Sequence, residues 1–314
     1  MRSLRAAMIT VLAVVLALGS AGCTNPTRDS RSDGGPVTVT HVFGATTVTG
    51  TPKNIVALGD QWVDASLALG VTPIGRLGSL PGDPPPWTPN SLAAAKPLEA
   101  TADLAPQIAA LHPDLILLDR LPTDRKTYDD LAAVAPTVPR AADAGWRAQM
   151  TVLGKLLRKT DEADRIIADF DTRLTDTVRA NPGLTGKTYA ATWLASDAQL
   201  FVLTRPSVAA SELFTRLGLR IPDGLAARSD TEGNLVLAPD RLGDLTADLL
   251  LAGHSPGLDE KYRLLPGYAD LPAARKDAVA FLTTDEIAAV EQPTVLSARY
   301  LLDKLTPALT GAAR

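Results

Sequence analysis

Side chains that bind metal ions are sparse in this chain. Its 314 residues contain one cysteine, Cys23, and three histidines, His41, His112 and His254. Zinc sites take three or four ligands from Cys, His and carboxylate side chains, and other first-row metals also favour imidazole or thiolate. Only His254 follows a predicted strand, and we interpret His41 and His112 as surface or packed residues. The sequence therefore predicts no directly bound metal, and a single cysteine excludes an internal disulfide.

Motifs for nucleophilic catalysis or phosphate binding are also absent from the sequence. It contains no G-x-S-x-G elbow, no G-x-x-x-x-G-K-[ST] loop and no G-x-G-x-x-G loop. Ser207 follows Arg205 and Pro206 after a predicted strand, but the sequence places no histidine beside it as a base. We therefore predict a binding protein and not an enzyme, without a resident cofactor.

The elements that position these residues alternate between strand and helix. Apolar runs at 54–59, 72–75 and 114–119 are predicted strands, with amphipathic segments between them. After residue 183 the alternation resumes, with predicted strands at 188–193, 199–203, 248–253 and 278–283. This rhythm predicts an α/β fold with mostly parallel strands.

A continuous helical pattern from Trp146 to Asn181 separates the two halves. Its apolar residues recur every three or four positions, which is the spacing of one helix face. Thr160 or Asp161 is a predicted internal N-cap, and the Asn-Pro-Gly at 181–183 predicts a helix end. We expect a helix near 146–158 and a longer one near 161–181, about 30 Å in length.

The two halves also resemble each other. LAPQIAALHPDLILL (104–118) parallels LAPDRLGDLTADLLL (237–251), and residues 66–75 parallel 213–222 in the same order. We therefore predict two Rossmann-like α/β lobes, 37–158 and 183–314, joined by a single long α-helix at 159–182. Ligands of α/β lobes bind at the carboxyl ends of the strands, so we expect a ligand cleft between the lobes.

The first 36 residues have the features of a targeting segment and a tether. Residues 1–22 begin with Arg2 and Arg5, continue with an apolar run and end with small residues, as a signal peptide does. The segment before Cys23 resembles a bacterial lipobox, although it has Ser20 where leucine is usual. We expect cleavage before Cys23 and lipidation of its thiol, which would hold the protein on the outer face of the cytoplasmic membrane. The alternative is an ordinary secretory signal. Residues 23–36 are predicted to be a flexible lipidated tether.

The net charge is −4, or −6 without Arg2 and Arg5. A nucleic-acid partner would need a basic face, so the charge argues against one.

Several segments together resemble a known family. They are VTVTHVFGATTVTGTPKNIVALG (37–59), DASLALGVTPIG (64–75), IAALHPDLILL (108–118) and the single long helix. Over about residues 37–309 the chain resembles the substrate-binding lipoproteins of ABC importers for ferric siderophores, haem and cobalamin. The resemblance implies a monomeric extracytoplasmic receptor with a shallow cleft. It would capture a ferric siderophore, with iron present only inside the chelate, and pass it to an ABC permease subunit.

A cleft for such a chelate needs cations for its charge and aromatic rings for stacking. Candidates follow the predicted strand ends: Gln61, Trp62, Arg76, Trp87 and Arg120 in the first lobe, and Trp193, Arg205, Ser207, His254 and Thr284 in the second. We expect Trp62 and Trp87, in predicted loops, to stack on the chelate while Arg205 and Arg76 neutralise it. Trp193 is equally consistent with a core position.

The resemblance further implies docking on the permease through one acidic residue per lobe. In the second lobe this residue is Asp240, whereas the corresponding first-lobe residue is Pro106. Either Asp103 or Glu99 substitutes for it, or the protein is a cell-envelope interaction protein that has lost transport. A haem or corrinoid receptor of the same fold is a further alternative, with His254 available as a haem ligand.

Overall fold

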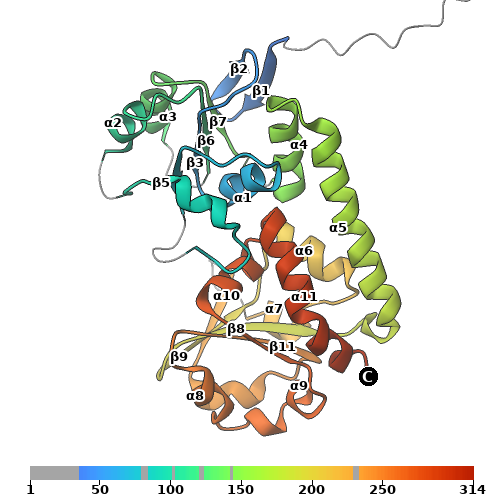
Figure 1. Cartoon of the computed structure of the whole chain (residues 1–314). Coiled ribbons are helices and arrows are strands. Elements are labelled where there is room, and N and C mark those ends of the chain that lie inside the picture. Colours follow the sequence, from blue (N-terminus) through green and yellow to red (C-terminus); the bar gives the residue numbers. More distant parts are fainter. Residues whose placement is uncertain (1–34, 79–83, 101–102, 120–123, 142–143, 229–232) are drawn as a thin grey trace, which may run out of the picture.

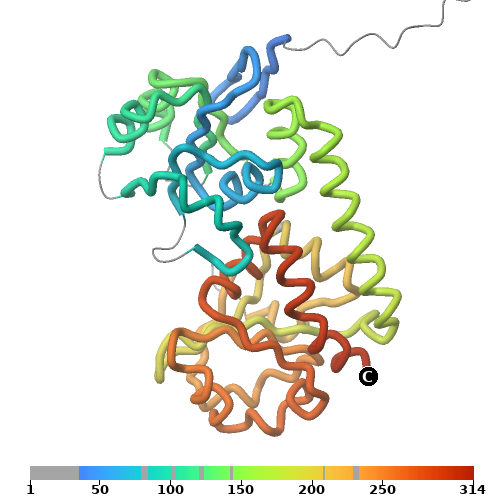
Figure 2. The backbone as a smooth tube through the Cα atoms, viewed as in Figure 1, coloured from blue at the N-terminus to red at the C-terminus, as the bar shows by residue number. Residues whose placement is uncertain are grey.

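Two α/β lobes are connected by a long helix, with one lobe at each end of it. The computed structural model describes residues 35–78, 84–100, 103–119, 124–141, 144–228 and 233–314. Helix α5 (Thr160–Ala180) runs along one side of the molecule, from the helices of the first lobe to the second (Figure 1). The tube in Figure 2 shows the chain crossing between the lobes along this helix. The predicted fold class is confirmed, and α5 lies within one residue of the predicted 161–181.

The first lobe is built on a five-stranded parallel sheet with the order β5-β4-β3-β6-β7. Its strands are β3 (Ile55–Leu58), β4 (Gly75–Leu77), β5 (Lys96–Pro97), β6 (Leu115–Leu118) and β7 (Thr137–Pro139), preceded by the antiparallel hairpin of β1 (Val37–His41) and β2 (Gly44–Val48). Its helices are α1 (Asp60–Ala68), η1 (Asn90–Ala94), α2 (Leu104–Ala109), α3 (Arg125–Ala132) and α4 (Trp146–Leu156). All residues of β3 and β6 are buried, as expected of central strands in a sheet covered on both faces.

The second lobe repeats this arrangement in the order β10-β9-β8-β11-β12. Its strands are β8 (Tyr189–Ser196), β9 (Gln199–Leu203), β10 (Asn234–Leu237), β11 (Leu249–His254) and β12 (Val279–Leu282). Its helices are η2 (Pro182–Leu184), α6 (Val208–Arg216), α7 (Asp223–Ala226), η3 (Pro239–Asp244), α8 (Asp259–Arg263), η4 (Tyr268–Asp270), α9 (Pro272–Arg275), α10 (Thr284–Glu291) and α11 (Val295–Ala312). The two lobes share one strand order, in keeping with the similarity of their sequences. The difference is β9, which runs antiparallel to both of its neighbours, β8 and β10.

The similarity of the two lobes includes one aspartate at an equivalent position in each. Asp114, just before β6, accepts hydrogen bonds from the backbone N–H groups of Lys53 and Asn54 at 2.8 and 2.9 Å. Asp248, just before β11, accepts bonds from the N–H and hydroxyl of Thr188, both at 3.0 Å. Each carboxylate therefore ties the start of one central strand to the start of its neighbour.

Replacing Asp248 by alanine is expected to lower the free energy of unfolding by about 1–2 kcal/mol, because two hydrogen bonds to Thr188 are lost. Urea denaturation measures the change. The control is Asp244→Ala, since Asp244 pairs with the exposed Arg241 three residues away and such pairs contribute little. Equal losses in the two variants would contradict the proposed tie between β8 and β11.

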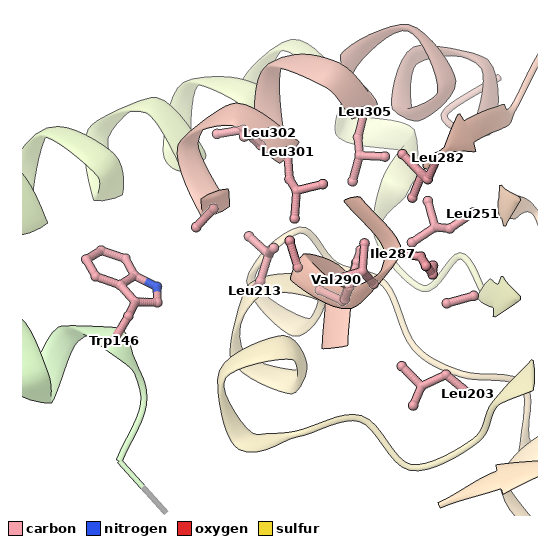
Figure 3. Packing of buried hydrophobic residues seen from close by; sticks show 14 of the residues in the cluster. Trp146, Leu203, Leu213, Leu251, Leu282, Ile287, Val290, Leu301, Leu302 and Leu305 are labelled. Atoms are coloured by element: carbon pink, nitrogen blue, oxygen red, sulfur yellow. The ribbon is translucent and has the colours of Figure 1, made fainter. Parts of the chain in front are cut away.

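Helices α10 and α11 cover the second sheet and form much of its core. Figure 3 shows Ile287 and Val290 of α10 beside Leu251 of β11, and Leu301, Leu302 and Leu305 of α11 next to them. All are at most 6% exposed. None of the helices in the described part of the chain combines the length and apolar character that a membrane-crossing segment needs.

Candidate functional site

A pocket of about 300 Å³ lies between the second sheet and α10. Its lining comes from β8, β9, the start of β10 and one face of α10: Ala191, Thr192, Trp193, Phe201, Leu203, Asn234, Thr284, Ile287, Ala288 and Glu291. Thr284 is the first residue of α10 and is separated from the end of β12 only by the N-cap residue Thr283. The pocket therefore includes a carboxyl-end position of a parallel strand, where α/β lobes bind ligands.

The strand register builds an aromatic wall on this face of the sheet. Trp193 of β8 is paired with Phe201 of β9, and their rings are stacked at a centroid distance of 5.6 Å and an angle of 24°. Paired residues on neighbouring strands point to the same face. On the other side of Trp193 the paired residue is Gly253, where a Cβ atom would lie 2.8 Å from Ile287. Glycine at this position allows α10 to approach the sheet.

Trp193, a residue of the lining, carries a polar atom that lacks a partner among the described residues. The Nε1–H group of Trp193 is buried and makes no hydrogen bond to any described residue. Thr192, by contrast, is bonded to the Tyr262 hydroxyl at 2.6 Å and to the Leu251 carbonyl at 3.1 Å. An indole N–H can only donate, so an oxygen of a bound molecule would satisfy it.

Arg205 and Ser207 are hydrogen-bonded to residues at or next to the pocket lining. The backbone N–H of Arg205 donates to the Gly233 carbonyl at 2.9 Å, next to Asn234 of the lining. Arg205 is exposed and makes no ion pair with any residue in the described ranges. Ser207 caps α6 by accepting from the Ala210 N–H, and its hydroxyl donates to the Glu291 carbonyl at 2.6 Å. Ser207 thus has a structural role that joins α6 to α10.

The first lobe contacts this region through α1. The side-chain amide of Gln61 donates to the carbonyls of Gln292 and Pro293 at 3.3 and 3.0 Å, directly after the Glu291 end of the pocket. Gln61 is 7% exposed. We expected it to contact a ligand after β3, whereas the structure uses it to hold the two lobes together beside the pocket.

The predicted loop position of Trp62 is wrong, and Trp87 makes contacts between the lobes that were not predicted. Helix α1 begins at Asp60, immediately after Gly59, so Trp62 lies in its first turn and not in a loop. It is 1% exposed within the core, and so has no surface for stacking on a ligand. Trp87 is in a turn as predicted, but its ring packs against Tyr300 of α11 at 5.6 Å and its Nε1–H donates to Asp64 at 3.1 Å. These contacts place Trp87 at the interface between the lobes.

The carboxylate of Asp64 is the centre of that interface. It accepts hydrogen bonds from Trp87 of its own lobe and from the Thr294 hydroxyl, which caps α11 in the other lobe. Asp64 is 3% exposed. Burial raises its pKa to about 7, and the nearby charge of Asp60 adds to the increase, while both hydrogen bonds oppose it.

The other predicted residues lie in varied environments. Arg76 of β4 is half-buried, and its Nε–H has no partner within the described residues. His254 follows Gly253 in β11 and so points to the opposite face of the sheet from Trp193, with its ring 6.5 Å from that of Phe281. Asp240 is exposed on η3. Arg120 and Cys23 lie outside the described residues.

Of the predicted site residues, the structure brings Trp193 and Thr284 together in the pocket and places Arg205 next to its lining. Sequence reasoning named none of the other eight lining residues, which are Ala191, Thr192, Phe201, Leu203, Asn234, Ile287, Ala288 and Glu291. The short connection between the two predicted strands is a signal that could have indicated a hairpin, and hence the proximity of Phe201 to Trp193. The four of these residues that come from β10 and α10 are brought in by long-range packing and gave no local signal.

Comparison with known proteins gives consistent matches. Residues 99–286 match the model of the periplasmic binding protein family. The chain is 32% identical over 176 residues to a probable siderophore-binding lipoprotein, YfiY, of Bacillus subtilis, an alignment that covers 54% of this chain and 53% of that protein. It is 25% identical over 286 residues to the Fe(3+)-citrate-binding protein YfmC of the same species, covering 86% of each. A crystal structure of a periplasmic solute binding protein from Mycobacterium smegmatis superimposes with a TM-score of 0.73 at 28% identity, over 89% of this chain and 99% of that one.

Proposed function

The chain belongs to the periplasmic binding protein family, and we propose that it captures a ferric siderophore outside the cytoplasmic membrane and delivers it to an ABC importer. The observation that carries the proposal is the pocket with an aromatic wall in the second lobe, with the exposed Arg205 next to its lining. Aromatic rings suit the flat arms of an iron chelate, and a guanidinium suits its negative charge. The relatives named for siderophore and Fe(3+)-citrate binding support the same ligand class. This role requires no catalytic step.

The remaining parts of the proposal concern the partners. Lipidation of Cys23 would hold the receptor at the outer face of the membrane, and residues 24–36 would give it reach. The exposed Asp240 on η3 is the proposed contact with the permease subunit. A monomer is sufficient for capture and delivery.

Tryptophan fluorescence of the full chain in detergent, titrated with ferric siderophores, haem and cobalamin, tests the ligand class. We expect saturable quenching by a ferric siderophore, because Trp193 lines the pocket, and no saturation with the iron-free chelator. Saturable quenching by haem alone would replace the siderophore as ligand. A flat response to every compound would overturn the proposal, and the interaction-protein alternative would then be pursued by capture of envelope partners.

Replacing Arg205 by alanine is expected to weaken binding of an anionic chelate by about 1–3 kcal/mol, through loss of a charge-assisted contact. The loss should shrink as salt is added, since the side chain is exposed. The matched control is Arg165→Ala, on the exposed face of α5, whose ion-pair partner among the described residues is Asp169. Unchanged affinity in Arg205→Ala would remove this residue from the site.

A further inference from the structure

The pocket in the second lobe is small for a whole iron chelate. Its volume of about 300 Å³ is at the lower end of the range of about 300–1,000 Å³ for pockets that enclose drug-sized ligands. A ferric siderophore is larger than such a ligand, so only part of it fits here. The rest would lie outside, toward Arg205 and the first lobe.

The chemistry of the lining indicates which part enters. The walls are the stacked rings of Trp193 and Phe201 together with the aliphatic groups of Leu203, Ile287 and Ala288. A flat aromatic ring can stack on such a wall and bury its area there. The Trp193 Nε1–H is buried and without a partner in the described residues. It would donate to an oxygen carried by that ring, or by its linking group, once the entering ring displaces the side chains that cover it.

The charges around the pocket argue against a carboxylate. Among the described residues that line it, none is lysine or arginine. Burying a carboxylate without a cation is strongly unfavourable. The exposed Arg205 lies next to the lining, where it can face the charged iron centre instead.

We infer that the pocket holds an aromatic arm of the iron chelate, and hence that the ligand is a catecholate- or phenolate-type siderophore and not a citrate-type carboxylate. The inference rests on the proposed function and goes beyond it by selecting the ligand class. It also assigns Ala288 a role in specificity, because a larger residue on this face of α10 would fill the space for the ring.

Calorimetric titration of the full chain in detergent provides the test. The probes are ferric enterobactin, a tris-catecholate; ferrioxamine B, a trihydroxamate without aromatic rings; and ferric citrate. We expect ferric enterobactin to bind at least about tenfold more tightly than the other two, from burial and stacking of one ring.

Two variants assign that preference to the pocket. Ala288→Leu should weaken ferric enterobactin by about tenfold or more through overpacking, and Trp193→Phe by about fivefold through loss of one hydrogen bond. The controls are Ala109→Leu, at an exposed position of α2, and Trp146→Phe, which removes the same atoms from a buried tryptophan of α4. Neither control should change the affinity. Thermal unfolding of all four variants identifies any that fail to fold.

The outcomes separate the inference from the proposed function. If ferric citrate or ferrioxamine B binds as tightly as ferric enterobactin, the aromatic-arm inference is wrong while siderophore binding stands. The same follows if a folded Ala288→Leu binds ferric enterobactin as the native protein does. If none of the three chelates binds, both the inference and the proposed function fail.

Discussion

The native protein is expected to lose about 4 kcal/mol of its free energy of unfolding as the pH rises from about 4 to 7, and the variant Asp64→Asn is expected not to show this loss. Asp64 lies in α1 at the lobe interface and is 3% exposed. Burial raises its pKa from the usual 3.8 to about 7. The difference of about three pH units corresponds to about 4 kcal/mol at 1.36 kcal/mol per unit.

The sign follows from the protonation of the two states. Between pH 3.8 and about 7 the carboxyl is ionised in the unfolded chain but protonated in the native protein. Folding therefore takes up a proton, and stability falls as the pH rises through this range. Above about 7 the group is ionised in both states and its contribution no longer changes. The native lobe interface is thus weakest at neutral and alkaline pH.

Urea denaturation at several values between pH 5 and 8 measures the effect, which should reach about 2–3 kcal/mol between pH 5 and 7. This pH range lies above the titration of the buried Glu286. Burial alone would raise the pKa of Glu286, but its hydrogen bonds with Tyr300 and Thr283 and the charge of Lys304 lower it. Asparagine keeps an oxygen that can accept from Thr294 and Trp87, so the contacts persist in the variant.

The control for this experiment is Asp176→Asn, which alters an exposed carboxylate on α5 paired only with Arg179. Its stability should follow the same pH curve as the native protein. If Asp64→Asn retains the native slope, a different group carries the pH dependence and Asp64 is ionised in the native state.

The parts of the fold that depend on local pattern were predictable from the sequence. The helix–strand alternation, the ends of α5 and the repeat of the two lobes all follow from the spacing of apolar residues and from caps within a few positions. Asp114 and Asp248, whose carboxylates bond to the starts of neighbouring strands, also lie in the two similar segments, 104–118 and 237–251. Trp193 and Thr284 line the pocket, in keeping with the expectation that residues at strand ends meet at one edge of a sheet, and their contact with a ligand stays a prediction.

The lobe interface could not be predicted in this way. The bond between Thr294 and Asp64 joins residues 230 positions apart, and nothing near Asp64 in the sequence distinguishes it from a surface aspartate on a helix. Trp62 was misplaced because α1 starts one residue after Gly59 and turns the indole into the core. A tryptophan near a strand end therefore supports a ligand site only when the start of the next helix is also known.

Replacing Arg140 by alanine is expected to lower the free energy of unfolding by about 3 kcal/mol, because it removes the guanidinium that is paired with a buried carboxylate. Arg140 pairs with Asp119, and their side chains are 11% and 6% exposed. Backbone bonds from Asp119 to Leu58 and from Arg140 to Leu118 fix both residues at the carboxyl edge of the first sheet. The guanidinium also donates to the Ala144 carbonyl at 3.1 Å.

Three further variants separate burial of this pair from simple loss of a contact. Arg125→Ala breaks an exposed ion pair with Asp129, with side chains 67% and 52% exposed, and should cost about 0–1 kcal/mol. Arg140→Lys keeps the charge but loses the planar fork, so its loss should be intermediate. The double variant Arg140→Met with Asp119→Leu should recover most of the stability, since apolar side chains of similar volume replace a buried pair well. If Arg140→Ala costs no more than Arg125→Ala, water reaches Asp119 in the native protein. The carboxyl edge of the first sheet would then be open enough to contact a ligand directly.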